Sequence, residues 1–146
     1  MNPPLAPAAS EALALAQDEA IRHGHRSAGT EHVLFALATV AGPDMADVLG
    51  ALGTSCAAVR CAVRCVIPAG RPLHDQGRRL TPRAKVALDL AVRCASRSGS
   101  QYTNPRHLIY GLAAEREGLA AQVLLSQGIT AAAVNRLLLP TLELAA

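Results

Sequence analysis

Apolar residues recur along the first half of the chain at the three- and four-residue spacings that are typical of amphipathic helices. Turn-forming residues separate four such segments: Gly24 ends the first, Gly42 and Pro43 divide the second from the third, and Gly53 ends the third. Pro7 is well placed to begin the first helix, because the first helical position needs no N–H donor. The pattern therefore predicts four helices in the first half.

Short polar residues stand just before several of these segments, where helix N-caps are expected. Thr30 is predicted to cap the second helix, and Glu31 would then lie at the positive end of the helix dipole. Thr54 or Ser55 is predicted to cap the fourth helix. These residues mark two helix starts independently of the apolar spacing.

The second half of the chain matches the first half at a constant offset of 75 positions, with no gap. An alanine-rich chain gives chance matches, but glycine, proline, histidine and arginine are harder to match by accident. The matched pairs of these types include Pro7 with Pro82, Arg22 with Arg97, Gly24 with Gly99, His32 with His107, and Gly53 with Gly128. The sequence is therefore predicted to contain one unit of about four helices twice, which makes about eight helices in an all-α fold.

This duplication divides residues 1–146 into predicted parts of a single domain. Repeat 1 covers about residues 5–66, a polar and turn-rich linker covers about residues 67–79, and repeat 2 covers about residues 80–139. The helix boundaries predicted in repeat 2 are a start at Thr81 and Pro82, a second start at Asn104 and Pro105, a cap at Thr130, and an end or bend at Pro140.

Composition supports a helical bundle with small side chains. Apolar residues make up 51% of the chain and are mostly alanine, leucine and valine, whereas the aromatic residues are Phe35, Tyr102 and Tyr110. Alanine and leucine are strong helix formers, and strands favour aromatic and β-branched residues. The net charge of +3 comes from thirteen scattered arginines and Lys85. Because a concentrated basic stripe is missing, we expect no nucleic-acid partner.

The sequence also limits the compartment and the metal chemistry. It has no run of 18 apolar residues and no basic segment before an apolar core, so we expect no membrane span, no signal peptide and a cytoplasmic location. Cys56, Cys61, Cys65 and Cys94 are expected to be reduced and to act mainly as small buried hydrophobes, with a redox or regulatory thiol as the alternative. Their spacing does not match a zinc site, and we expect no metal and no cofactor.

Four short stretches carry a family resemblance. They are Leu15 to Ala20 (LAQDEA), Gly24 with His25, Gly29 to Leu34 (GTEHVL), and Leu80 to Lys85 (LTPRAK). Together with the duplication, they resemble the double N-terminal repeat domain of the Clp/Hsp100 AAA+ unfoldases, above all the ClpC type, over about residues 5–139. The resemblance implies an all-α module with a pseudo-twofold axis that recruits substrates and adaptor proteins.

The same resemblance implies a phosphoarginine site, since some ClpC-type domains bind this group with a glutamate in the Gly-Thr-Glu-His stretch of each repeat. Thr30 and Glu31 keep this stretch in repeat 1. Arg106 replaces the acid in repeat 2, and Pro105 removes a backbone donor, so this second site is expected to have lost phosphoarginine while Arg106 can still attract an anion. The alternative is that Thr30 and Glu31 only cap a helix.

Two further pairs of residues follow from the duplication. Leu5 and Leu80 stand where the family's unfoldases carry phenylalanine on a surface used by partners, so they form a candidate apolar partner surface without aromatic stacking. His32 and His107, each in the first turn of a predicted helix, are expected to be structural histidines rather than ligands.

The sequence shows no catalytic machinery. It has no Walker loop, and its single lysine, Lys85, follows Ala84. Cys94, His107 and Asp89 have no spacing that supports a catalytic set, so we predict that the chain is not an enzyme. Three functions stay open: a binding module for Clp components, adaptors or tagged substrates; a phosphoarginine or small-ligand sensor; and a structural role through homodimerisation. We expect a monomer.

Overall fold

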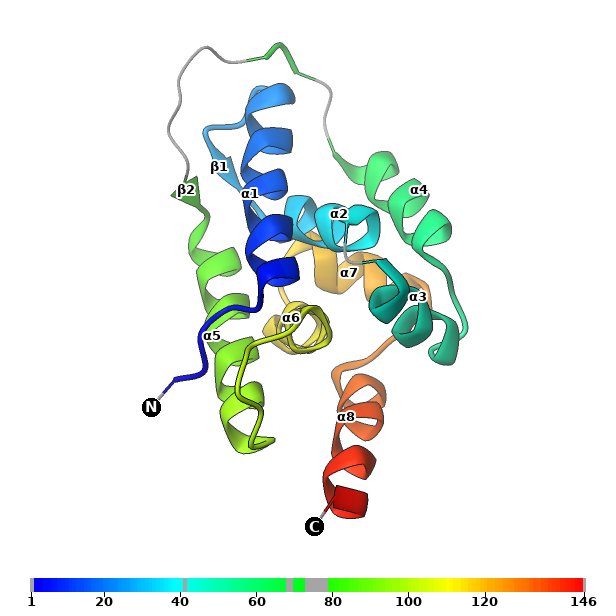
Figure 1. Cartoon of the computed structure of the whole chain (residues 1–146). Coiled ribbons are helices and arrows are strands. Elements are labelled where there is room, and N and C mark those ends of the chain that lie inside the picture. The colour runs from blue at the N-terminus through cyan, green and yellow to red at the C-terminus, as the bar shows by residue number, and fades with distance from the viewer. Residues whose placement is uncertain (1, 41, 68–69, 73–78, 146) are drawn as a thin grey trace.

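The computed structural model describes residues 2–40, 42–67, 70–72 and 79–145, with side-chain surroundings as far as Leu138. Within these residues the chain forms eight helices and two strands of two residues each (Figure 1). The elements of the first half are α1 (Pro7–Arg22), β1 (Ser27–Ala28), α2 (Thr30–Val40), α3 (Gly42–Ala51) and α4 (Cys56–Val66). The elements of the second half are β2 (Arg79–Leu80), α5 (Pro82–Arg97), α6 (Pro105–Glu115), α7 (Leu119–Ser126) and α8 (Ala131–Ala145).

Helices begin and end at equivalent positions in the two halves. The first residues of α1 and α5, of α2 and α6, and of α4 and α8 are each 75 positions apart. Gly24 and Gly99 follow α1 and α5 with φ of 82° and 70°, and Gly53 and Gly128 follow α3 and α7 with φ of 87° and 77°. Glycine adopts this left-handed conformation at helix ends without a steric penalty. The predicted succession of four helices, twice, is confirmed.

Each repeat is hydrogen-bonded to the other just before its first helix. β1 and β2 pair in parallel, and a parallel bridge joins Leu5 to Thr103. The Ala6 N–H donates to the Thr103 carbonyl at 3.0 Å, and the Thr81 N–H donates to the Ala28 carbonyl at 2.9 Å. The two bonds are equivalent, because Ala6 and Thr81, like Ala28 and Thr103, are 75 positions apart. One runs from repeat 1 to repeat 2 and the other runs from repeat 2 to repeat 1. The predicted pseudo-twofold relation is thus confirmed.

Small side chains let the helices approach closely around a central core. Figure 1 shows α2, α6 and α7 in the middle of the molecule, with α1 and α5 along one side. α1 buries an alanine stripe of Ala9, Ala12, Ala16 and Ala20. In α6, a Cβ on Gly111 would overlap the Ala87 carbonyl of α5, so glycine is required for this helix contact.

The matched histidines close two helix starts. Nδ1 of His32 accepts a hydrogen bond from the Gly29 N–H at 3.0 Å, and Nδ1 of His107 accepts one from the Asn104 N–H at 2.9 Å. Desolvation by burial lowers the pKa of His32 to about 4, with smaller contributions from two neighbouring histidines. Burial, and next the charge of Arg106, lower the pKa of His107. Both rings act as neutral structural caps, as expected.

α2 begins at Thr30 as predicted, but the predicted cap is wrong. The Thr30 hydroxyl does not cap its own helix, since it accepts a hydrogen bond from the Ala120 N–H at the start of α7, at 3.2 Å. Of the two alternatives at Pro140, an end of the last helix is wrong because α8 continues to Ala145, and a bend stays a prediction. Proline removes one backbone donor, but its fixed φ is compatible with helical dihedral angles.

The remaining cap predictions are resolved by individual hydrogen bonds. Ser55, rather than Thr54, caps α4 by accepting from the Ala58 N–H at 3.1 Å. Thr130 caps α8 by accepting from the Ala133 N–H at 3.1 Å, as predicted. Most of the predicted linker falls outside the described residues, and its last residue, Arg79, lies in β2.

The buried His32 predicts a specific loss of stability in acid. Its folded pKa of about 4 lies below the ordinary value of 6.5, so the unfolded chain binds a proton that the folded chain does not bind between these pH values. The free energy of unfolding should therefore have its full value above pH 6.5. It should fall by up to about 3 kcal/mol as the pH approaches 4. Urea denaturation from pH 7 to 4.5 measures this change.

His32→Asn keeps a hydrogen-bond acceptor but does not titrate, so it should lose this part of the pH dependence. His23→Asn is the matched control, because the His23 side chain is 38% exposed. It should retain most of the wild-type dependence. An unchanged pH dependence in His32→Asn would show that His32 does not carry the effect.

Candidate functional site

The predicted site residues Thr30 and Glu31 lie in a pocket where the starts of three helices meet. Strand β1 leads directly into α2, and strand β2 leads directly into α5. The pairing of the two strands therefore places these two helix starts together. The hydrogen bond from the Ala120 N–H to the Thr30 hydroxyl attaches the start of α7. We call this cavity of about 410 Å³ the helix-start pocket, and its lining is Gly29, Thr30, Glu31, Thr81, Pro82, Arg83, Glu117, Gly118 and Leu119.

The carboxylate of Glu31 is held against the backbone at the start of α2. Its side chain is 13% exposed and folds over Gly29, where a Cβ would overlap Oε1 of Glu31. The N–H groups at the start of a helix have no acceptor within that helix. Among the described residues, no backbone hydrogen bond takes the N–H of Glu31, Arg83 or Leu119. The pocket therefore combines a carboxylate acceptor with backbone donors.

Arg83 brings a positive charge to the rim of this pocket. Its guanidinium contacts Glu115 Oε1 at 3.2 Å and Glu117 Oε2 at 2.6 Å. Hydrogen bonds to Glu117 and Glu115 raise the pKa of Arg83 further. Glu115 also accepts from the Gly118 N–H at 2.7 Å, whereas the Glu117 side chain is 73% exposed. Arg83 is thus oriented by one anchored and one exposed carboxylate.

The equivalent position in repeat 2 is chemically different. Nη2 of Arg106 contacts Oδ1 of Asp44 at 3.3 Å, and Asp44 of α3 is the counterpart of Leu119 in the helix-start pocket. Nε of Arg106 is buried and has no hydrogen-bond partner among the described residues. Pro105 has no N–H to donate. An anion would have to compete with Asp44 for this guanidinium, and its attraction to Arg106 stays a prediction.

Leu5 and Leu80 occupy equivalent places in the two junctions between the repeats. Leu5 makes the backbone bridge to Thr103, and Leu80 lies in β2 opposite Ala28. Both side chains are partly buried and pack against the hydrophobic core. They therefore contribute to the core and are partly exposed, and the apolar partner surface stays a prediction.

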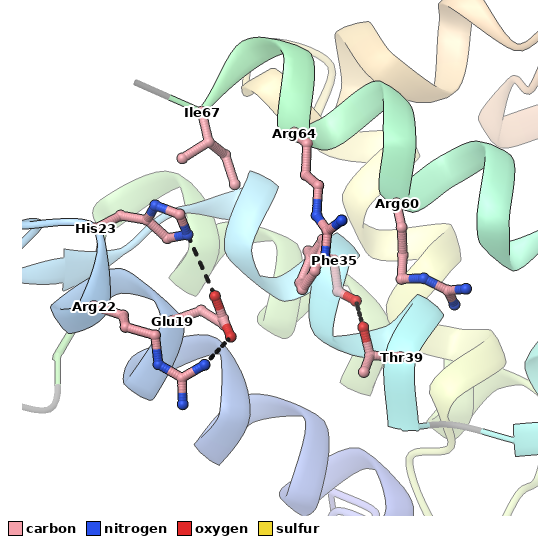
Figure 2. Close-up of a pocket in the computed structure, with 8 residues that line it drawn as sticks. All are labelled: Glu19, Arg22, His23, Phe35, Thr39, Arg60, Arg64 and Ile67. Atoms are coloured by element: carbon pink, nitrogen blue, oxygen red, sulfur yellow. Dashed lines mark hydrogen bonds and ion pairs between the residues drawn. The ribbon is translucent and has the colours of Figure 1, made fainter. Parts of the chain in front are cut away.

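A larger cavity, of about 680 Å³, lies between α1, α2 and α4 in repeat 1 (Figure 2). Figure 2 shows Arg60 and Arg64 extending from α4 toward α2, with the Phe35 ring beneath Arg64. We call it the arginine cavity. Its lining is Glu19, Arg22, His23, Phe35, Thr39, Arg60, Arg64 and Ile67.

Sequence reasoning missed this cavity because it treated the arginines as a scattered set. Arg60 and Arg64 are four positions apart and lie on one face of α4. Phe35, the single phenylalanine of the chain, lies within the helix that packs against α4. The i, i+4 spacing of the arginines indicated that they share one helix face. The packing of α4 against α2 is a tertiary contact, which no local sequence pattern predicts.

The structure does not assemble the residues that were considered as a catalytic set. Asp89 is paired with Arg93 at 3.1 Å on the surface of α5, and His107 accepts its backbone cap with Nδ1. Burial raises the pKa of the Cys94 thiol, which disfavours a nucleophilic thiolate. The prediction that the four cysteines are buried is confirmed for Cys94 and holds in part for Cys56, which is partly buried. It is wrong for Cys61 and Cys65, which are exposed on α4.

Across the part of the chain that the structure describes, no group of three or more His, Cys, Asp or Glu residues could hold a metal ion. No single described helix is long and apolar enough to cross a membrane. The pair α2 and α3, bent by 110° relative to each other, is long and apolar enough by length and composition alone.

Comparisons with known proteins agree with this architecture. The family profile of the Clp repeat (R) N-terminal domain matches residues 5–127 and 79–143. The "Negative regulator of genetic competence ClpC/MecB" of Bacillus subtilis (strain 168) is 38% identical over 122 residues, which are 84% of this chain but 15% of that protein. This chain therefore spans a small part of that relative.

Solved structures share the fold at low sequence identity. The N-domain of ClpV from Vibrio cholerae has a TM-score of 0.76 at 20% identity, over 95% of this chain and 85% of that one. The N-terminal domain of the chaperone ClpD from Arabidopsis thaliana has a TM-score of 0.71 at 21% identity, over 95% and 94%. From its fold, its duplication and its sequence, the chain belongs to the Clp repeat N-terminal domain family.

Proposed function

We propose that this chain is a non-catalytic protein-binding module of the Clp chaperone and protease system. It would act as an accessory, adaptor or decoy that binds Clp components, adaptors or tagged substrates, and we propose that it does so as a monomer in the cytoplasm. Membership of the Clp repeat family supports this proposal. The sequence printed here contains no Walker loop, so we propose no ATP-driven unfolding for these residues.

The observation that carries the proposal is the helix-start pocket, which lies between the repeats and contains Glu31 of repeat 1. It gathers the starts of α2, α5 and α7 around Glu31, in a cavity of about 410 Å³. This volume lies within the range of about 300–1,000 Å³ that is common for ligand sites. The counterpart in repeat 2 has its basic residue paired internally, since Arg106 contacts Asp44 at 3.3 Å. A partner that binds through one positively charged group would therefore prefer the pocket that contains Glu31.

A pull-down from the source cell tests the proposed role. The wild-type chain should retain Clp components, their adaptors or tagged substrates, measured by quantitative mass spectrometry. Glu31→Gln should retain less of any partner that uses the helix-start pocket, because it removes the carboxylate charge. Glu11→Gln is the matched control on the exposed face of α1. If the wild type recovers no Clp-related protein, this role is incorrect.

Phosphoarginine is the second candidate, as a ligand of the same pocket. Its N–H groups would meet the Glu31 carboxylate, and its phosphate would meet the unpaired N–H groups at the helix starts. Arg83 would add a cation once the exposed Glu117 side chain moves away from it. The contact between Arg83 and Glu115 would remain, since Glu115 is anchored by the Gly118 N–H.

Titration calorimetry with free phosphoarginine tests this candidate. The wild type should release or take up heat with saturation, and Glu31→Gln should weaken binding about tenfold or more, as expected when one charged partner of a hydrogen-bonded pair is lost. Glu11→Gln should bind as the wild type does. The absence of heat with the wild type, or equal affinities for wild type and Glu31→Gln, would remove phosphoarginine from consideration.

A further inference from the structure

We propose that the arginine cavity is a second binding surface, and that it takes an acidic segment of a partner protein with an apolar side chain next to its carboxylates. The helix-start pocket and the arginine cavity have no lining residue in common. This inference therefore goes beyond the proposed function, which depends on Glu31. Four features of the cavity support it: its uncompensated charge, the fixed position of that charge, its apolar floor, and the altered counterpart in repeat 2.

The cavity has an excess of positive charge. Its one lining carboxylate, Glu19, is already engaged by Arg22 at 3.1 Å and by His23 at 3.4 Å. Arg60 and Arg64 contact no carboxylate among the described residues. Two guanidinium groups, one helical turn apart, thus face the cavity without a counter-charge from the described part of the chain.

Both guanidinium groups are held in place by the protein. Nη1 of Arg60 donates to the Ala38 carbonyl at 2.6 Å, and the guanidinium of Arg64 lies 5.2 Å from the centre of the Phe35 ring. A cation over an aromatic face is attracted to it and still presents its N–H groups at the edge of the guanidinium plane. Because the two groups are positioned before binding, a carboxylate can meet them at a lower entropic cost.

The apolar floor of the cavity consists of Phe35 and Ile67, and Phe35 is 9% exposed, with its ring beneath Arg64. The Thr39 hydroxyl donates its hydrogen to the Phe35 carbonyl at 2.8 Å, so it is not a free donor to a ligand. A volume of about 680 Å³ is enough for a few side chains. A small inorganic anion would leave this apolar surface uncovered, whereas a segment with both acidic and apolar side chains would cover it.

Repeat 2 provides an internal comparison. At the offset of 75 positions, Cys94 replaces Glu19, Asn135 replaces Arg60, and Leu139 replaces Arg64. The cavity at this place in repeat 2 has a volume of about 120 Å³, and its lining includes Cys94 and Asn135. The fold therefore does not require arginines here, and their presence in repeat 1 needs a separate explanation, which ligand binding supplies.

A protein segment fits these features better than a nucleic acid does. Nucleic-acid binding uses many phosphate contacts along an extended basic surface. Here the uncompensated charge consists of two arginines beside one cavity, and the arginines of the chain as a whole are scattered. Charge complementarity with an apolar floor thus favours a short acidic and apolar stretch.

Fluorescence anisotropy with two labelled hexapeptides tests this proposal. One peptide alternates glutamate and leucine, and the other alternates lysine and leucine. The glutamate peptide should bind more tightly, and Arg60→Gln/Arg64→Gln should weaken its binding about tenfold or more. Arg97→Gln/Arg136→Gln removes the same charge from repeat 2 and should change the affinity by less than about twofold.

A charge-reversal variant and NMR spectra locate the peptide on the protein. Arg64→Glu leaves the hydrogen bond between Arg60 and Ala38 in place, so it should stay folded by thermal denaturation and should also lose binding of the glutamate peptide. In NMR spectra, the peptide should shift the amide signals of α4 and of the end of α1, and should leave those of Thr30 and Glu31 unchanged. This result is independent of phosphoarginine binding and of Glu31→Gln.

Three outcomes would overturn the proposal. The two peptides could bind equally well, the arginine variants could bind like the wild type, or the shifted signals could lie at Thr30 and Glu31 instead. Displacement of the peptide by millimolar inorganic phosphate at constant ionic strength would likewise contradict it, because the cavity would then be a small-anion site only.

Discussion

Two backbone hydrogen bonds, one in each direction between the repeats, hold the starts of their helices together. The Thr81 N–H donates to the Ala28 carbonyl and the Ala6 N–H donates to the Thr103 carbonyl. Each bond lies within two residues of a helix start, so it determines where the N–H groups of that helix are directed. The helix-start pocket follows from this constraint, because the bond from Thr81 to Ala28 places the start of α5 beside Glu31.

The two repeats share the same arrangement of helices but carry different side chains at equivalent positions. At the helix start, repeat 1 presents Glu31, while repeat 2 presents Arg106 paired with Asp44. Between the first and fourth helices, repeat 1 has a cavity of about 680 Å³ with Arg60 and Arg64, and repeat 2 has one of about 120 Å³. The helix-start pocket draws its lining from both repeats, whereas the arginine cavity is lined by repeat 1 and the residue that follows it, Ile67.

Much of the fold could be predicted from sequence because its signals are local or repeated. Apolar spacing, Gly24 and Gly53 at helix ends, and the constant offset all survive in the structure. The errors concern interactions between distant residues. The Thr30 hydroxyl caps α7 from 90 positions away, which no local cap rule anticipates. Cys61 and Cys65 are exposed because α4 is peripheral and buries Val59 and Val63 instead.

The candidate site was predictable only in part for the same reason. Thr30 and Glu31 were identified from a local motif, and they do lie in a pocket. Arg83 and Glu117 join them from α5 and from the start of α7, through packing between the repeats. The arginine cavity depends on the contact of α4 with α2, so the spacing of its arginines became meaningful only with the tertiary structure.

The central claim is that one frame is used twice and that the phosphoarginine chemistry is kept at the helix starts around Glu31. The most direct measurement is the number of phosphoarginine molecules bound per chain, for the wild type and for a variant in which the residues around Arg106 are changed to their counterparts around Glu31. This variant carries Asp44→Leu, Asn104→Gly, Pro105→Thr and Arg106→Glu. The account predicts one bound molecule for the wild type and two for the variant. Two molecules on the wild type, or no gain in the folded variant, would contradict it.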